Sequence, residues 1–103
     1  MTYADLDPVI YPWSKKFGLH IYTFIRDDEI RSMDIVDDSG DIYKLHIFPA
    51  DKENQSVSVG IWDGKNKHAE YQTSLPLLET CLDDAYAKVS EWINSRGHTR
   101  TIY

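Results

Sequence analysis

Between residues 19 and 73 the chain is a succession of short segments in which hydrophobic and polar residues alternate. Such alternation predicts β-strands, because successive side chains point to opposite sides of a strand. Four strands are predicted at 19–26, 29–37, 41–48 and 56–62, with a shorter fifth strand at 69–73. The turns between them are short and rich in Asp and Gly, which favours antiparallel pairing of consecutive strands.

The hydrophobic period changes after residue 74. From there the apolar residues recur every three or four positions, as on one face of a helix, at Leu78, Cys81, Leu82, Ala85, Val89, Trp92 and Ile93. Ser74 suits the N-cap, Pro76 the first turn and Gly97 the position after the last turn, so a helix is predicted over 75–97.

The first 18 residues are predicted to form an irregular N-terminal arm. Pro8 and Pro12 disfavour a helix interior, although one helical turn could form between Trp13 and Phe17. The arm is too apolar for a free tail and should pack on the rest of the chain. Together the segments predict one α+β domain over 1–103, in which a four- or five-stranded antiparallel meander (19–73) carries one C-terminal helix on one face.

Simple register assigns side chains to the two faces of this sheet. The helix-covered face would take Ile30 and Val36 of the second strand, but also Ser32 and Asp34. Burying the charge of Asp34 there would be unfavourable, unless a bulge shifts the register. The opposite face collects bulky residues: His20, Tyr22, Phe24, Met33, Ile35, Lys44, His46, Phe48 and Trp62. The N-terminal arm covers this second face, a protein partner or second subunit does, or each covers a part of it.

The net charge of −6 is concentrated in one stretch. Residues 27–41 hold seven of the 17 acidic side chains and one of the 11 basic ones, so the remainder of the chain is neutral. This charge disfavours nucleic acid and favours a basic partner, although solvated turns also collect Asp. A single cysteine, no long apolar run and no signal-peptide pattern at the start lead us to expect a cytoplasmic protein without a membrane span.

The chain contains no known catalytic motif, and we expect no enzyme activity, cofactor or metal site. Cys81 falls on the apolar face of the helix, where a buried thiol is typical. The segment from Asp37 to Asp41 lacks the glycine position and the closing glutamate of a calcium loop. The alternative function is a small ligand-binding or hydrolytic domain that uses His20, His46 and Asp34.

The segment Gly18-Leu19-His20-Ile21-Tyr22-Thr23, which follows Trp13, resembles a Gly-aliphatic-x-Ile-x-Thr strand. Small immunity proteins of bacterial polymorphic toxin systems carry such a strand after a Trp-containing arm, then an acidic meander and a closing helix that ends in Trp. The segment from Leu75 to Ile93, with Trp92 near its end, is similar to that closing helix. The resemblance implies a cytoplasmic protein, without enzyme activity, that blocks a cognate toxin domain.

These observations favour a protein-binding function, most concretely the neutralisation of a basic toxin domain. Acidic turns would attract the partner, and aromatic side chains would supply the buried contacts. The candidate partner-binding residues are Tyr22, Phe24, Asp27, Asp28, Glu29, Asp37, Asp38, Asp41, His46 and Trp62. A homodimer formed through the same face is a third possibility.

Overall fold

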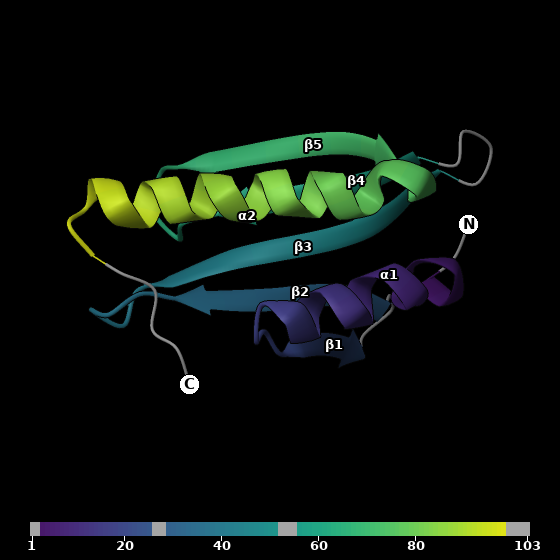
Figure 1. The fold of residues 1–103 in the computed structure, drawn as a ribbon, viewed down its shortest axis with the longest axis horizontal. Helices are drawn as coiled ribbons and strands as arrows, with labels where there is room; N and C mark the ends of the chain where they lie inside the picture. Colours follow the sequence, from purple (N-terminus) through teal and green to yellow (C-terminus); the bar gives the residue numbers. More distant parts are fainter. Residues whose placement is uncertain (1–2, 26–28, 52–55, 99–103) are drawn as a thin grey trace.

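The computed structural model of the protein describes residues 3–25, 29–51 and 56–98, and for residues 23–25, 29–30 and 50–51 it describes the backbone alone. Within these residues, five strands form one antiparallel sheet in the order β1-β2-β3-β4-β5 (Figure 1). The elements are α1 (Tyr3–Lys16), β1 (Ile21–Ile25), β2 (Glu29–Val36), β3 (Ile42–Asp51), β4 (Ser56–Trp62), β5 (His68–Ser74), the 3₁₀ turn η1 (Leu75–Leu77) and α2 (Leu78–Ser95). The predicted α+β meander with a C-terminal helix packed on it is confirmed.

Helix α2 lies over β4 and β5 and buries the apolar face that the sequence pattern predicts (Figure 1). Ser74 precedes η1 but makes no side-chain capping bond, and Pro76 sits in that 3₁₀ turn. The other end of α2 closes at Gly97, whose φ of 74° is accessible to glycine without strain. The next amide, from His98, donates to the carbonyl of Ile93 and completes the helix end.

The prediction of an irregular N-terminal arm is wrong, because Tyr3–Lys16 forms helix α1. Pro8 and Pro12 both lie inside it and are exposed. Each proline removes one backbone hydrogen bond, to the carbonyls of Ala4 and Pro8, which belong to exposed residues that water can reach. The opposite side of α1 buries Leu6, Ile10 and Trp13, and this packing outweighs the propensity against a helix.

Both helices lie on the same face of the sheet and run in the same direction across it (Figure 1). The indole of Trp13 donates a hydrogen bond of 2.9 Å to Asp83 of α2. The rings of Trp13, Phe17 and Tyr86 pack beside this bond, with centroids 4.4 to 6.1 Å apart. The helices therefore form one continuous layer over the sheet.

A buried arginine joins the other end of α1 to the sheet. The guanidinium of Arg31 on β2 donates to both carboxylate oxygens of Asp7, at 3.0 and 3.1 Å. It also lies 4.4 Å from the ring centre of Tyr3, whose hydroxyl donates to the carbonyl of Ile47. The two-pronged charged pair fixes the helix in position as well as neutralising the buried cation.

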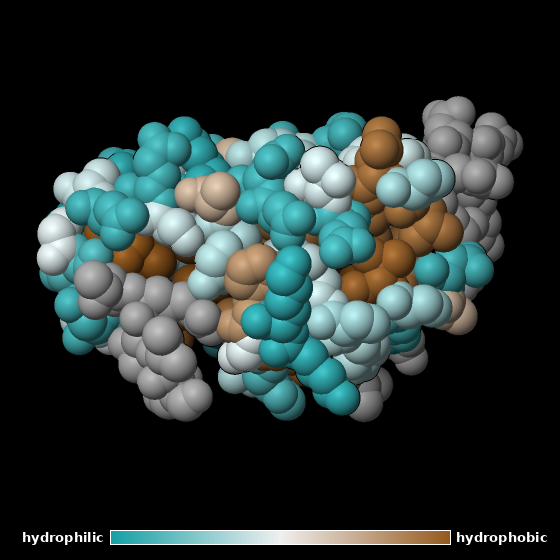
Figure 2. Space-filling model, in the orientation of Figure 1, coloured by the Kyte–Doolittle hydropathy of each residue, from teal (hydrophilic) through white to brown (hydrophobic). Residues whose placement is uncertain are grey.

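The core fills the space between the helix layer and one face of the sheet. Tyr43, Leu45 and Ile47 on β3 and Val57, Val59 and Ile61 on β4 are fully buried there, as the alternation predicts. Figure 2 shows that the solvent side of the helix layer is largely hydrophilic, with hydrophobic surface gathered near the start of α2, where Leu77 is exposed.

The prediction of which β2 side chains face the core is wrong, because the pairing of β1 with β2 is shifted by one residue. Ile25 pairs with Glu29, so three residues separate the strands instead of the two expected at Asp27–Asp28. The extra residue reverses the parity of the pairing, because side chains alternate with a period of two. Met33 and Ile35 consequently lie in the core, whereas Ser32 and Asp34 pair with His46 and Lys44 on the other face.

No helix within the described ranges is both long enough and apolar enough to cross a bilayer.

The packing of α1 can be tested with two neighbouring residues. Replacing the fully buried Ile10 by Ala should lower the free energy of unfolding by about 2–4 kcal/mol, because it leaves a cavity between α1 and the sheet. Tyr11→Ala, on the exposed side, should change it by about 0.5 kcal/mol or less. Urea denaturation of both variants measures the difference. Equal effects would contradict the packing of α1 on the sheet.

Candidate functional site

The face of the sheet that is turned away from α1 and α2 is the candidate site, and we call it the outer face. Cross-strand pairs lie on a common face, so the register defines its rows. One row runs from Tyr22 through Ser32, His46 and Gly60 to Glu70. The next row runs from Asp34 through Lys44 and Trp62 to His68.

The outer face is not covered by the N-terminal segment. Of the explanations that the sequence leaves open, covering by residues 1–18 is wrong, because α1 packs beside α2 on the opposite face (Figure 1). In the described part of the chain, no other element lies over the outer face. Its large side chains are therefore available for contacts outside the described chain.

Four large hydrophobic side chains are exposed on the outer face: Tyr22, Ile42, Phe48 and Trp62. Their exposed fractions are 38–45%, whereas the core residues on the other side of β3 and β4 are fully buried. A sheet face open to water ordinarily carries polar side chains. Aromatic side chains grouped on such a face are typical of protein interfaces.

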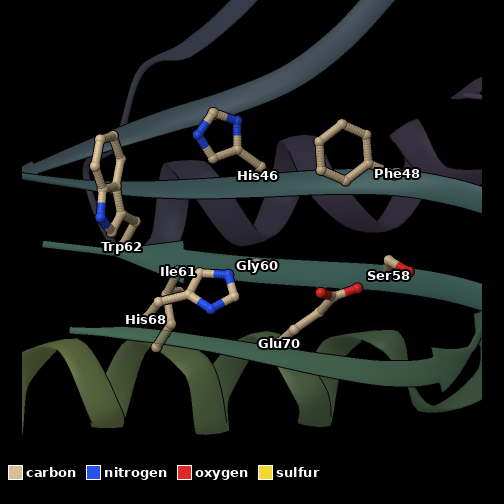
Figure 3. A pocket seen from close by; sticks show the side chains of 8 residues that line it. All are labelled: His46, Phe48, Ser58, Gly60, Ile61, Trp62, His68 and Glu70. Atoms are coloured by element: carbon tan, nitrogen blue, oxygen red, sulfur yellow. The ribbon is translucent and has the colours of Figure 1, made fainter. Parts of the chain in front are cut away.

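A groove of 420 Å³ opens in the middle of this face, above Gly60 of β4. Gly60 contributes no side chain, and so leaves a hollow between β3 and β5. Figure 3 shows His46 and Phe48 on one side of it, His68 and Glu70 on the other, and Trp62 at one end. The imidazole of His46 and the ring of Phe48 lie nearly parallel, at an angle of 8°, and form a flat wall.

The groove is lined by one acidic side chain, Glu70, and by two imidazoles, His46 and His68. Burial lowers the pKa of His46, Lys44 lowers it further and Asp34 opposes the change, so His46 is mostly neutral near pH 7. Glu70 accepts one hydrogen bond, from Gln72 at 3.3 Å, and forms no ion pair with a described cation. Lys44 is already held by Asp34 at 2.7 Å.

Of the three residues of the alternative hydrolytic function, only His46 lines the groove. His20 packs edge-on against the ring of Tyr22, and Asp34 is paired with Lys44. Neither of them lines the groove, which takes His46 from this set. The polar groups that do meet there are His46, His68, Glu70 and Ser58.

Of the acidic residues proposed for partner binding, the structure describes the side chains of Asp37, Asp38 and Asp41. Asp27 and Asp28 lie outside the described residues, and so do the side chains of Glu29 and Phe24. Asp37, Asp38 and Asp41 lie beyond the opposite end of β2, an eight-residue strand of about 26 Å. These three acids therefore lie at the opposite end of β2 from Glu29.

Asp37 is a structural residue of the β2–β3 turn. Its buried carboxylate accepts hydrogen bonds from the amides of Ser39 and Asp41, from the hydroxyl of Ser39 and from that of Tyr43. Burial alone would raise the pKa of Asp37, but these hydrogen bonds outweigh it and hold the pKa below its ordinary value of 3.8. A carboxylate with this many donors is a poor contact for a partner.

The β4–β5 turn repeats the same construction around Asp63. Its carboxylate accepts from the amides of Lys65 and Lys67, two and four residues later, at 2.8 and 2.9 Å. Burial would raise the pKa of Asp63, but these bonds and Arg96 bring it below 3.8. Arg96, at the end of α2, donates to Asp63 and to the hydroxyl of Tyr43, and so connects α2 to both turns.

The more exposed acids of the β2–β3 turn also have partners. His98 lies 3.1 Å from Asp38, and Lys65 lies 3.7 Å from Asp41. Ligand atoms of Asp37, Asp41 and His98 lie within 4.8 Å of one another, but the hydrogen bonds on Asp37 leave it little capacity for a metal ion. The polar residues at this end of the sheet therefore stabilise the fold.

Of the predicted partner-binding residues, the structure places Tyr22, His46 and Trp62 together on the outer face. The backbone of Phe24 pairs with that of Ile30. The sequence reasoning missed the groove itself, including Gly60, His68 and Glu70. The alternation of polar residues in 68–72 beside a strand glycine was the available signal for them.

Neither a protein-family model, nor a curated protein, nor a solved structure matches this chain significantly.

The two turn aspartates predict a loss of stability in acid. Because their folded pKa values lie below the ordinary value, the unfolded chain binds protons more readily. Their contribution is therefore complete above about pH 5 and is lost as the pH falls through 3.8 towards the lower folded values. Asp63→Asn should be less stable at pH 7 and lose less on acidification. The exposed Glu79→Gln is the control, and urea midpoints at several pH values are the measurement. An acid response of Asp63→Asn equal to that of the wild type would contradict the role of Asp63.

Proposed function

We propose that this protein binds another protein through the outer face of its sheet. The observation that carries the proposal is the group of exposed large side chains on a sheet face that both helices leave open. Burying such rings is a principal source of binding energy at interfaces, and a few of them can dominate it. The groove at Gly60 adds a concave feature into which a partner side chain can fit.

In its specific form, the proposal is that the partner is a basic toxin domain and that the protein is its cytoplasmic inhibitor. The resemblance of Gly18–Thr23 and of the closing helix to immunity proteins supports this form, and so does the net charge of −6. An inhibitor of this kind acts by occupying its partner and needs no catalytic group of its own. The partnered acids of the β2–β3 turn leave long-range attraction as the main contribution of the negative charge.

The outer-face proposal is tested by comparing two substitutions of exposed hydrophobic residues. Trp62→Glu places a charge on the outer face, and Leu77→Glu places the same charge on the helix side. For a partner isolated from the native organism with the wild-type chain, Trp62→Glu should weaken the affinity about thirtyfold, whereas Leu77→Glu should leave it unchanged. Isothermal calorimetry gives both values, and circular dichroism checks the fold. Loss of affinity in Leu77→Glu alone would place the interface on the helix side.

The charge of the partner is tested by the salt dependence of association. The association rate with a basic partner should fall several-fold between about 0.05 and 0.5 M NaCl, because screening weakens long-range attraction. Stopped-flow mixing measures the rate, and the dissociation rate should change less. A rate that is indifferent to salt would contradict a basic partner. Sedimentation of the chain alone at two concentrations separates this case from self-association.

A further inference from the structure

We propose that the groove at Gly60 receives an arginine side chain of the protein partner, stacked on the outer-face rings and paired with Glu70. This inference rests on the proposed function and names the chemistry that the groove recognises. Its parts are a hollow, flat apolar walls and a carboxylate, and they come from three neighbouring strands (Figure 3).

The hollow exists because β4 has a glycine at its centre. Gly60 pairs with His46 on β3 and with Glu70 on β5, so it lies between the two side chains that bound the groove. Apart from Gly60 itself and its two chain neighbours, no described residue has a heavy atom within 4 Å of the position that a Cβ would occupy at Gly60. A partner side chain can therefore reach the backbone of the sheet there.

Glu70 decides the charge of the occupant. An apolar side chain in the groove would remove water from the Glu70 carboxylate without replacing its hydrogen bonds, which is costly for a charge. An anionic group would meet this carboxylate directly, and a largely neutral His46 would give it little compensation. A cation removes both penalties. Lys44 does not fill this role, since Asp34 already holds it at 2.7 Å.

The walls decide between the two common cationic side chains. Trp62, Phe48 and the parallel imidazole of His46 offer flat surfaces around the hollow. A planar guanidinium stacks on such rings and binds a carboxylate with two parallel hydrogen bonds. A lysine ammonium is a compact, strongly hydrated charge. It can pair with the carboxylate, but it has no flat surface to stack on the rings. The groove therefore fits arginine better than lysine.

The test uses the whole chain and a small probe, so it needs no knowledge of the partner. The ¹⁵N-labelled protein is titrated with N-acetyl-arginine methylamide, and amide and indole shifts are followed by NMR. The citrulline analogue has nearly the same shape without the charge, and the lysine analogue has the charge without the plane. Shifts should be confined to residues around Gly60 and to the Trp62 indole, and the citrulline analogue should bind at least tenfold more weakly, with lysine between them.

Two variants locate the probe in the groove. Gly60→Val fills the hollow, and the open space at that position lets the sheet keep its fold. Glu70→Gln removes the charge and keeps the shape. Both should abolish the shifts, whereas Glu79→Gln, which removes an exposed carboxylate from α2, should bind like the wild type. The Glu70→Gln result is decisive even if Gly60→Val unfolds.

Equal binding of arginine and citrulline, unchanged binding by Glu70→Gln, or shifts elsewhere on the chain would each overturn the arginine site. None of these results touches the proposed function, which depends on the comparison of Trp62→Glu with Leu77→Glu. If those two variants show no role for the outer face while the probe still binds at Gly60, the groove is a cation site without the proposed interface.

Discussion

The structure depends on one constraint, namely that both helices share a single face of a five-stranded sheet. The core can then be built from one side of each strand, with Leu45 and Ile61 as examples. Met33 and Ile35 lie on this side because Ile25 pairs with Glu29 and Ile21 with Met33. Because of the same constraint, the side chains of the outer face are not part of the core, and Trp62 and its neighbours remain in contact with water.

Much of this arrangement could be predicted from periodicity. The alternation in β3 and β4 and the three-and-four spacing of α2 indicate their elements and their buried faces, because burial follows the pattern directly. Helix α1 could not be predicted in the same way, since Pro8 and Pro12 are read as helix breakers. They are tolerated because they lie on the exposed side, which only the tertiary packing determines.

The candidate site was partly predictable for the same reason. Tyr22 and Trp62 follow from strand parity, whereas the groove depends on which strand neighbours which, and so on Gly60 meeting His46 and Glu70. The acidic residues show the opposite limit. The sequence shows how many acidic residues the segment has, but not which of them already have partners. The carboxylate of Asp37 accepts hydrogen bonds within its own turn, and Lys65 lies beside Asp41.

The two prolines of α1 have a consequence for how the molecule holds together. Because α1 lacks two of its backbone hydrogen bonds, it would be an unstable helix in isolation. Its helical structure therefore depends on packing against the sheet. Detaching it would break the contacts of Asp7 with Arg31 and of Tyr3 with the backbone of Ile47, and would expose the buried side chains of Leu6 and Ile10 to water. The N-terminal helix and the sheet should therefore melt as one cooperative unit, with no stable intermediate in which α1 has peeled away.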